Sequence, residues 1–208
     1  MHGRLMQEKE LNPRKKPRQA RAEATVEAIL EAATRILSDS HFAEFNTNRV
    51  AEVAGVSIGS LYQYFPSKEA LTAALIERAQ KSLADAIEAC IDDSSEKSFD
   101  AVLAELVDIA IDHQFARAEY AVALDREEKR LPVEALITAS QRRIVTTLQN
   151  YLEREMAQAP PPSAAADCLA IAKALIEAEA DRHDVNVHEL RQRVMRTLLG
   201  YLRPPAGR

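Results

Sequence analysis

The sequence predicts an all-α protein. Glycine is absent between residues 60 and 199 and proline between 67 and 131, so a long stretch lacks the residues that most often interrupt helices. Alanine, leucine, glutamate and arginine dominate and favour helix, whereas alternating runs typical of strands are few. We expect about nine helices, arranged as an N-terminal three-helix unit followed by a larger helical domain.

Each expected helix carries apolar residues at intervals of three or four, the spacing of one helical face. In the first helix this stripe runs from Val26 to Leu37, and in the last from Leu190 to Leu202. Capping residues and prolines mark several ends. The expected helices lie at about 21–39, 47–54, 58–64, 67–91, 99–117, a shorter one ending near 129, one beginning at Pro132, 164–181 and 187–203.

Residues 46–65 predict a helix-turn-helix. Its two short helices are joined by the sequence AGVS, in which Gly55 supplies the positive φ that such a turn needs. Asn46 or Thr47 is expected to cap the first helix, and Ser57 the second, by accepting a hydrogen bond from a free backbone N–H group.

The second short helix predicts one buried and one outward face. Leu61 and Phe65 are four residues apart and are expected to face inward, which leaves Tyr62, Gln63 and Tyr64 on the outer faces. A phenol donates a hydrogen bond to a phosphate oxygen without needing charge. The outer face is therefore suited to a nucleic-acid backbone.

Two neighbouring positions strengthen this interpretation. The N-terminus of the second helix presents free N–H groups and partial positive charge, which suits phosphate. Gly59 lies on its first turn, where the missing side chain allows backbone to lie against a DNA strand or a base edge. Lys68 follows at the next helix start, within reach of another phosphate.

Charge is distributed unevenly along the chain. The net charge of −5 argues against a general nucleic-acid binder, yet the segment RKKPRQAR at 14–21 contains five basic residues and no acidic one. This arm is expected either to contact DNA or to be a solvated tail, and the two alternatives carry equal weight. Its candidate contacts are Arg14, Lys15, Lys16 and Arg18.

The stretch TNRVAEVAGVSIGSLYQYFPSKEAL resembles the DNA-binding signature of the TetR family of bacterial transcriptional regulators, which includes the AcrR type. The preceding QARAEATVEAILEAATRIL resembles the first helix of that family, so the resemblance covers residues 21–82. The chain departs from the family pattern at His41-Phe42, where many members have glycine before an aromatic residue, and at Asn46, where many have threonine.

The resemblance implies a two-fold dimer on a palindromic operator, with the 58–64 helix in the major groove of each half-site. Residues implied at phosphates are Thr47, Tyr62, Tyr64 and Lys68. Residues implied nearest base edges are Ser57, Ile58, Ser60 and Gln63. At Gly59 the backbone itself is expected to come close to the DNA. Gln63 is able to pair with adenine and Ile58 to touch a thymine methyl group.

The resemblance also divides the chain into an arm (1–20), a DNA-binding domain (21–82) and an effector-binding and dimerisation domain (83–208). Candidate effector contacts, polar or aromatic groups on apolar faces, are His113, Phe115, Tyr120, Ser140 and Gln141. The last two helices are expected to form the homodimer interface, although their apolar seam could instead pack within one subunit. The seam residues are Leu169, Ala172, Ile176, Leu190, Val194, Leu198 and Leu202.

Other classes of function lack a signal. His183 and His188 are five residues apart and share no helical face, and no Ser elbow, phosphate-binding glycine loop or Cys-His cluster appears, so we expect no enzyme, metal or cofactor. Cys90 and Cys168 are interpreted as unpaired thiols. No apolar run approaches ~18 residues and the N-terminus lacks a signal-peptide core, which predicts no membrane partner and a cytoplasmic location.

Three functions are compatible with these patterns. The first is a repressor released from DNA by a small-molecule effector. The second is a DNA-binding regulator without small-molecule input, controlled by its abundance or by a protein partner. The third is an interaction module that has lost DNA binding, against which Tyr62, Tyr64 and Lys68 argue.

Overall fold

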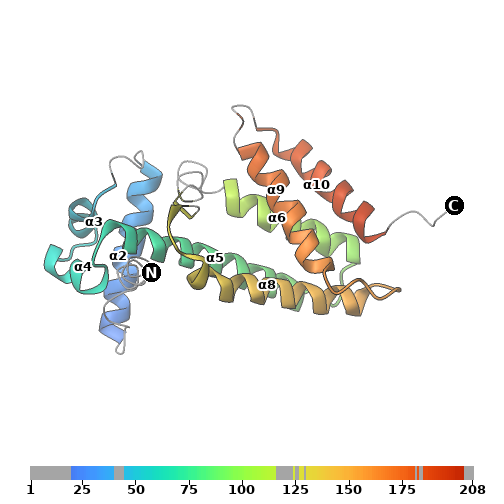
Figure 1. Cartoon of the computed structure of the whole chain (residues 1–208), viewed down its shortest axis with the longest axis horizontal. Helices are drawn as coiled ribbons and strands as arrows, with labels where there is room; N and C mark the ends of the chain where they lie inside the picture. The colour runs from blue at the N-terminus through green and yellow to red at the C-terminus, as the bar shows by residue number, and fades with distance from the viewer. Residues whose placement is uncertain are drawn as a thin grey trace, which may run out of the picture. The chain divides into compact units, whose positions relative to one another are not determined.

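The computed structural model describes residues 20–39, 45–115, 124, 127–128, 130–180, 182 and 185–203, and all regular structure in these ranges is helical. The elements are α2 (Ala20–Asp39), α3 (Thr47–Val53), α4 (Ile58–Tyr64), α5 (Lys68–Asp92), α6 (Phe99–Phe115), α8 (Glu134–Glu155), α9 (Ala164–Ala180) and α10 (Val187–Leu202) (Figure 1). The all-α prediction is confirmed. The expected short helix ending near 129 lies mostly outside the described residues.

The chain divides into two compact units. The first comprises Met1–Ala79 and Glu119–Ile137, and the second comprises Gln80–Ala118 and Thr138–Arg208. The chain passes from one unit to the other within α5 and again within α8, so both of these helices contribute residues to both cores.

The first unit is built around the apolar stripe of α2. Ile29 and Ala33 have no solvent exposure, and they lie in one core with Leu61, Phe65 and Leu71 from the elements that follow. Burial of an aliphatic or aromatic side chain stabilises a fold by about 1.5–3 kcal/mol. The short helices α3 and α4, too short to be stable alone, are therefore held by this core.

A segment from the middle of the chain completes the first core. Leu124, Leu131, Val133 and Ile137 are buried in the same cluster as α2, and Val133 has no exposure. From the sequence, the whole of 83–208 is expected to belong to the second domain. In the structure, these apolar side chains instead belong to the core of the first unit. The periodicity of a helix indicates that a residue is buried but not which core it joins.

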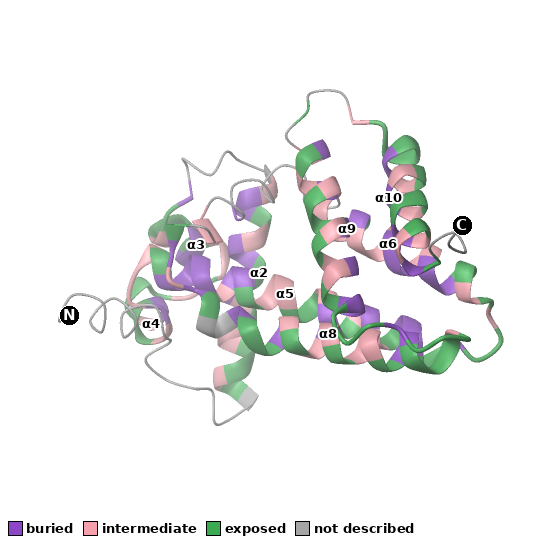
Figure 2. Cartoon of the chain, turned by 45° about the vertical axis from the view of Figure 1, so that its right-hand side comes forward, coloured by how far each residue is buried: buried purple, intermediate pink, exposed green. Residues whose placement is uncertain are grey.

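The second unit contains two apolar clusters. One lies among α6, α9 and α10 and includes Val107, Ile176 and Val194. The other contains residues of α5, α6 and α8, such as Ile87 and Ile144. Figure 2 shows buried residues along one side of α10 and exposed residues along the other.

Ion pairs join the helices of the second unit at defined positions. Arg143 of α8 contacts Glu88 and, at 2.9 Å, Asp85 of α5. Arg203 contacts Asp100 of α6 at 2.8 Å. Because these side chains are partly exposed, each pair contributes only about 0–1 kcal/mol to the free energy of unfolding.

We expect Ile137→Ala to destabilise the first unit although residue 137 is far from it in sequence. The side chain is 5% exposed in the first core, and removing it leaves a cavity that costs about 2–5 kcal/mol. Urea unfolding followed by circular dichroism measures the loss. Arg142→Ala, at an exposed position of α8, is the control and is expected to change stability by less than ~0.5 kcal/mol.

Candidate nucleic-acid interface

The turn between α3 and α4 depends on Gly55, whose φ is +66°. The N–H of Gly55 donates to the carbonyl of Glu52 at 3.1 Å, and the N–H of Val56 donates to the carbonyl of Ala51 at 3.0 Å. This pair of bonds is the Schellman motif, which ends a helix at a left-handed residue. The predicted role of Gly55 is confirmed.

Side chains cap both short helices. The Oδ1 atom of Asn46 accepts from the Arg49 N–H at 3.0 Å, so Asn46 is the cap of α3. The Oγ atom of Ser57 accepts from the Ser60 N–H at 3.0 Å and caps α4. The Ser57 and Ser60 hydroxyls also share a hydrogen bond of 2.8 Å. The start of each helix is thus fixed by its own sequence.

Burial of one face sets the rotation of α4. Leu61 and Phe65 are 0% and 1% exposed, as the sequence predicted. Tyr64 was expected on an outer face, but it is half-buried and packs against the first core. The reason is its spacing: a residue three after Leu61 lies on the flank of the same buried face.

The opposite face of α4 is open. Ile58 and Tyr62, four residues apart, are 38% and 40% exposed, and among the described residues the large apolar side chains this exposed are these two and Val187. Gly59 and Gln63 are exposed on the same short helix, as is its cap Ser57, whereas Ser60 is half-buried. This face therefore presents apolar and polar side chains together to the solvent.

Among the described residues, none comes so close to Gly59 that a side chain there would be excluded. A Cβ atom built there would meet only the Oγ of Ser57, at an ordinary contact distance of 3.9 Å, and the backbone φ is not left-handed. Glycine in a helix costs roughly 0.5–1 kcal/mol relative to alanine. Gly59 therefore differs from Gly55, which the backbone requires.

Two contacts fix the polar groups at this surface. The Thr47 and Tyr62 hydroxyls share a hydrogen bond of 3.1 Å, which joins the start of α3 to the outer face of α4. The Lys68 ammonium lies 5.3 Å from the centre of the Phe45 ring. Sequence reasoning missed Phe45; the available signal was an apolar residue directly before the cap of α3, the position of a hydrophobic staple.

The remaining predicted residues lie elsewhere. Arg14, Lys15, Lys16, Arg18 and Tyr120 are outside the described residues. In the second unit His113, Phe115 and Gln141 are half-buried, and Ser140 is buried. Of the predicted interface residues, Leu169 is half-buried, and those already buried within this chain are Ala172, Ile176, Leu190, Val194, Leu198 and Leu202.

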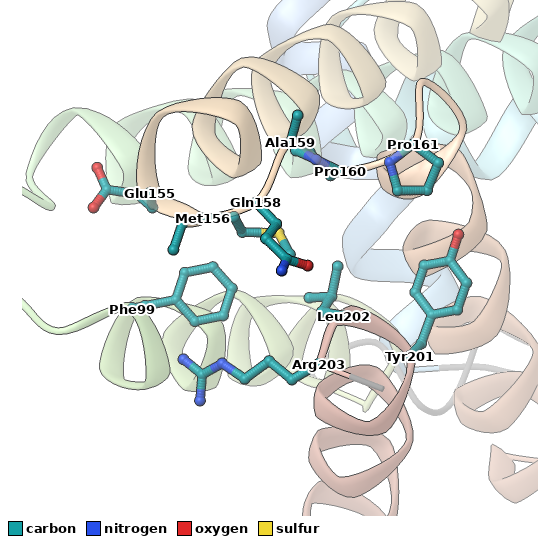
Figure 3. A pocket seen from close by; sticks show the side chains of 11 residues that line it. Phe99, Glu155, Met156, Gln158, Ala159, Pro160, Pro161, Tyr201, Leu202 and Arg203 are labelled. Atoms are coloured by element: carbon teal, nitrogen blue, oxygen red, sulfur yellow. The ribbon is translucent and has the colours of Figure 1, made fainter. Parts of the chain in front are cut away.

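A pocket of about 620 Å³ lies at one end of the second unit (Figure 3). It is lined by Phe99, residues 155–161 and residues 201–203, so none of the predicted effector residues lines it. The Arg203 guanidinium lies 5.0 Å above the Phe99 ring, and the Tyr201 hydroxyl donates to Asp167.

The described residues offer little for catalysis. Cys90 and Cys168 are unpaired and buried, and burial raises the pKa of each thiol to about 11, which keeps both protonated at neutral pH. No cluster of histidine, cysteine and carboxylate groups suited to a metal occurs in the described ranges. Within the same ranges, no helix is long and apolar enough to span a membrane.

The fold and this motif define a helix-turn-helix protein. Residues 29–75 match the family described as bacterial regulatory proteins, tetR family. The crystal structure of the TetR-like transcriptional regulator LfrR from Mycobacterium smegmatis, in complex with proflavine, matches with a TM-score of 0.54 and 25% identity, over 86% of this chain and 96% of that one. Residues 29–75 therefore form a DNA-binding region of the TetR family of bacterial transcriptional regulators.

Similar curated proteins match over the N-terminal region. The transcriptional regulator EthR of Mycolicibacterium smegmatis is 42% identical over 65 residues, 29% of this chain and 30% of EthR. The nucleoid occlusion factor SlmA of Haemophilus ducreyi is 42% identical over 62 residues, 29% of this chain and 31% of SlmA. The chain thus matches less than a third of the length of these relatives.

We expect Gly55→Ala and Gly59→Ala to change stability in opposite directions. A side chain at the φ of +66° is strained by about 1–2 kcal/mol, although space around the position is open. Gly59→Ala meets no strain and is expected to leave stability unchanged or raise it by up to ~1 kcal/mol. Urea midpoints of the two variants test this contrast, and equal destabilisation of both would contradict it.

Proposed function

We propose that the chain is a transcriptional regulator that binds duplex DNA through α4. The observation that carries the proposal is Gly59, an exposed helical glycine that no contact among the described residues requires. Glycine at an exposed helical position is useful where a binding partner must come close to the backbone. In this proposal Thr47, Tyr62 and Lys68 contact phosphates, and the DNA-binding domain is formed mainly by residues 21–82.

Base recognition falls to the exposed side chains at the start and middle of α4. Ile58 offers an apolar surface for a thymine methyl group, and Gln63 offers the paired donor and acceptor that match adenine. Ser57 and Ser60 already bond to each other, so they contact bases only through their remaining donor and acceptor positions. In this proposal the basic arm at 14–21 adds contacts along the DNA backbone.

We also propose that the working form is a homodimer. The seam of α9 and α10 is used inside the chain, so a second copy would cover their outward faces instead. Ala166, Ala170 and Ala174 are exposed at intervals of four along α9, and Gly200 is exposed on α10. Small residues on facing helices allow close approach, and a two-fold dimer matches two half-sites about 34–36 Å apart.

The second unit is proposed to receive a small-molecule effector that releases the protein from DNA and so relieves repression in the cytoplasm. Its pocket of about 620 Å³ has the size of a drug-like ligand site. The similar regulator LfrR was crystallised with proflavine, which supports a small-molecule site in this chain. A coupling of ~1–3 kcal/mol would change operator affinity about 5- to 150-fold.

A regulator without a small-molecule input is the second candidate. It is favoured by the similarity to SlmA, whose name describes a nucleoid occlusion factor rather than a regulator of transcription. Mass spectrometry of the native protein separates the two candidates. A co-purified ligand supports the effector, whereas an empty protein whose operator affinity no ligand library changes supports the alternative.

Selection from a pool of random duplexes tests the proposed function. Enrichment of a palindrome with two half-sites supports a dimeric DNA-binding regulator, and its genomic positions name the regulated genes. No enrichment, before and after refolding in the absence of ligand, would contradict DNA binding and favour an interaction module.

Tyr62→Phe is expected to weaken DNA binding at least ~10-fold, because a hydrogen bond to a charged phosphate contributes about 1.5–3 kcal/mol. The side chain is 40% exposed, so the change is expected to leave stability within ~0.5 kcal/mol. Fluorescence anisotropy with the selected duplex measures affinity. Gly59→Ala is the companion variant: the protein stays folded and the affinity falls. Unchanged affinity in both variants would remove α4 from the interface.

Ala170→Arg is expected to convert the dimer to a monomer, because a long charged side chain separates the two closely packed helices. Sedimentation velocity measures the change. The matched control is Ala89→Arg, at an exposed alanine of α5, which is expected to remain dimeric. A dimer in both variants would place the interface on another surface.

A further inference from the structure

We propose that Phe45 is a positioning residue for DNA binding: its ring holds the Lys68 ammonium in place to meet a phosphate of the duplex. This inference rests on the proposed function, because Phe45 would affect binding only if Lys68 contacts DNA. Phe45 itself contacts no DNA. It acts only through the lysine.

The geometry joins a fixed ring to a flexible cation. The Phe45 ring is 1% exposed, and the Lys68 Nζ atom lies 5.3 Å from its centre. A cation within about 6 Å of a ring centre is attracted to the negative face of the ring. Lysine carries its charge on a flexible four-carbon stem, so a contact at the end of that stem restrains the charge itself.

Both partners are anchored independently. Phe45 precedes the Asn46 cap of α3 and shares the first core with Val50, the arrangement of a hydrophobic staple. Lys68 is the first residue of α5, where the Ser67 Oγ accepts from the Ala70 N–H at 3.1 Å. The buried ring therefore keeps its position if the lysine side chain moves. The backbone of Lys68 is in turn held by the capped start of α5.

The position of the pair connects it to the other proposed phosphate contacts. Phe45 is two residues before Thr47, and the Thr47 hydroxyl bonds to that of Tyr62 at 3.1 Å. The ring that contacts Lys68 of α5 is therefore only two residues from the hydrogen bond that joins α3 to α4. Restraining a long side chain before binding avoids the entropy loss of ordering it on the DNA, a gain of roughly 2- to 10-fold in affinity.

A double-mutant cycle tests the proposal. Phe45→Leu, Lys68→Gln and the double variant are titrated with a short mixed-sequence duplex at low salt, because phosphate contacts do not depend on sequence. We expect Phe45→Leu to weaken binding roughly 2- to 10-fold in the wild-type background and to have no further effect once Lys68 is Gln. Phe45→Met provides a second apolar replacement, and urea midpoints establish that each variant is folded.

Phe65→Leu is the matched control, because Phe65 is also 1% exposed in the same core. Its effect on affinity is expected to be equal with Lys68 present or replaced. The proposal is overturned if Phe45→Leu behaves in the same way, or if Lys68→Gln leaves affinity unchanged while the wild type binds. A wild-type protein that binds no duplex at low salt would instead refute the proposed function itself.

Discussion

The left-handed backbone at Gly55 is the constraint on which the proposed interface depends. It ends α3 through two backbone hydrogen bonds and turns the chain so that α4 begins against the core. Without that turn, Leu61 and Phe65 could not enter the core while Ile58 and Tyr62 remain exposed. One dihedral angle, accessible at low cost only to glycine, thus separates the buried face of the motif from its open face.

Contacts with neighbouring side chains order the polar groups at this surface. Ser57 and Ser60 hold each other, Thr47 holds Tyr62, and a buried ring lies beside a lysine. Each contact removes rotational freedom from a polar group before any partner arrives. Binding surfaces ordered in this way lose less entropy on association, so a small surface suffices for useful affinity.

The sequence predicted local structure, such as turns and helix caps, better than it predicted which core each apolar residue joins. Gly55, Ser57, Leu61 and Phe65 obey rules that involve only residues within a few positions, and all behave as expected. Burial partners obey no such rule, so the place of Leu131, Val133 and Ile137 in the first core could not be predicted. For the same reason, the sequence left open whether the seam of α9 and α10 packs within one subunit or between two. Tyr64 shows the same limit, because its half-burial depends on the flank of α4 that meets the core.

The return of residues 131–137 to the first core also has a consequence for biosynthesis. A ribosome releases the chain from its N-terminus, so α2 to α4 emerge well before the residues that complete their core. Until Ile137 has left the exit tunnel, apolar surface on those helices has no final partner, and contacts of such long sequence separation form slowly. The helix-turn-helix therefore keeps apolar surface exposed for part of its synthesis, although it lies at the start of the chain.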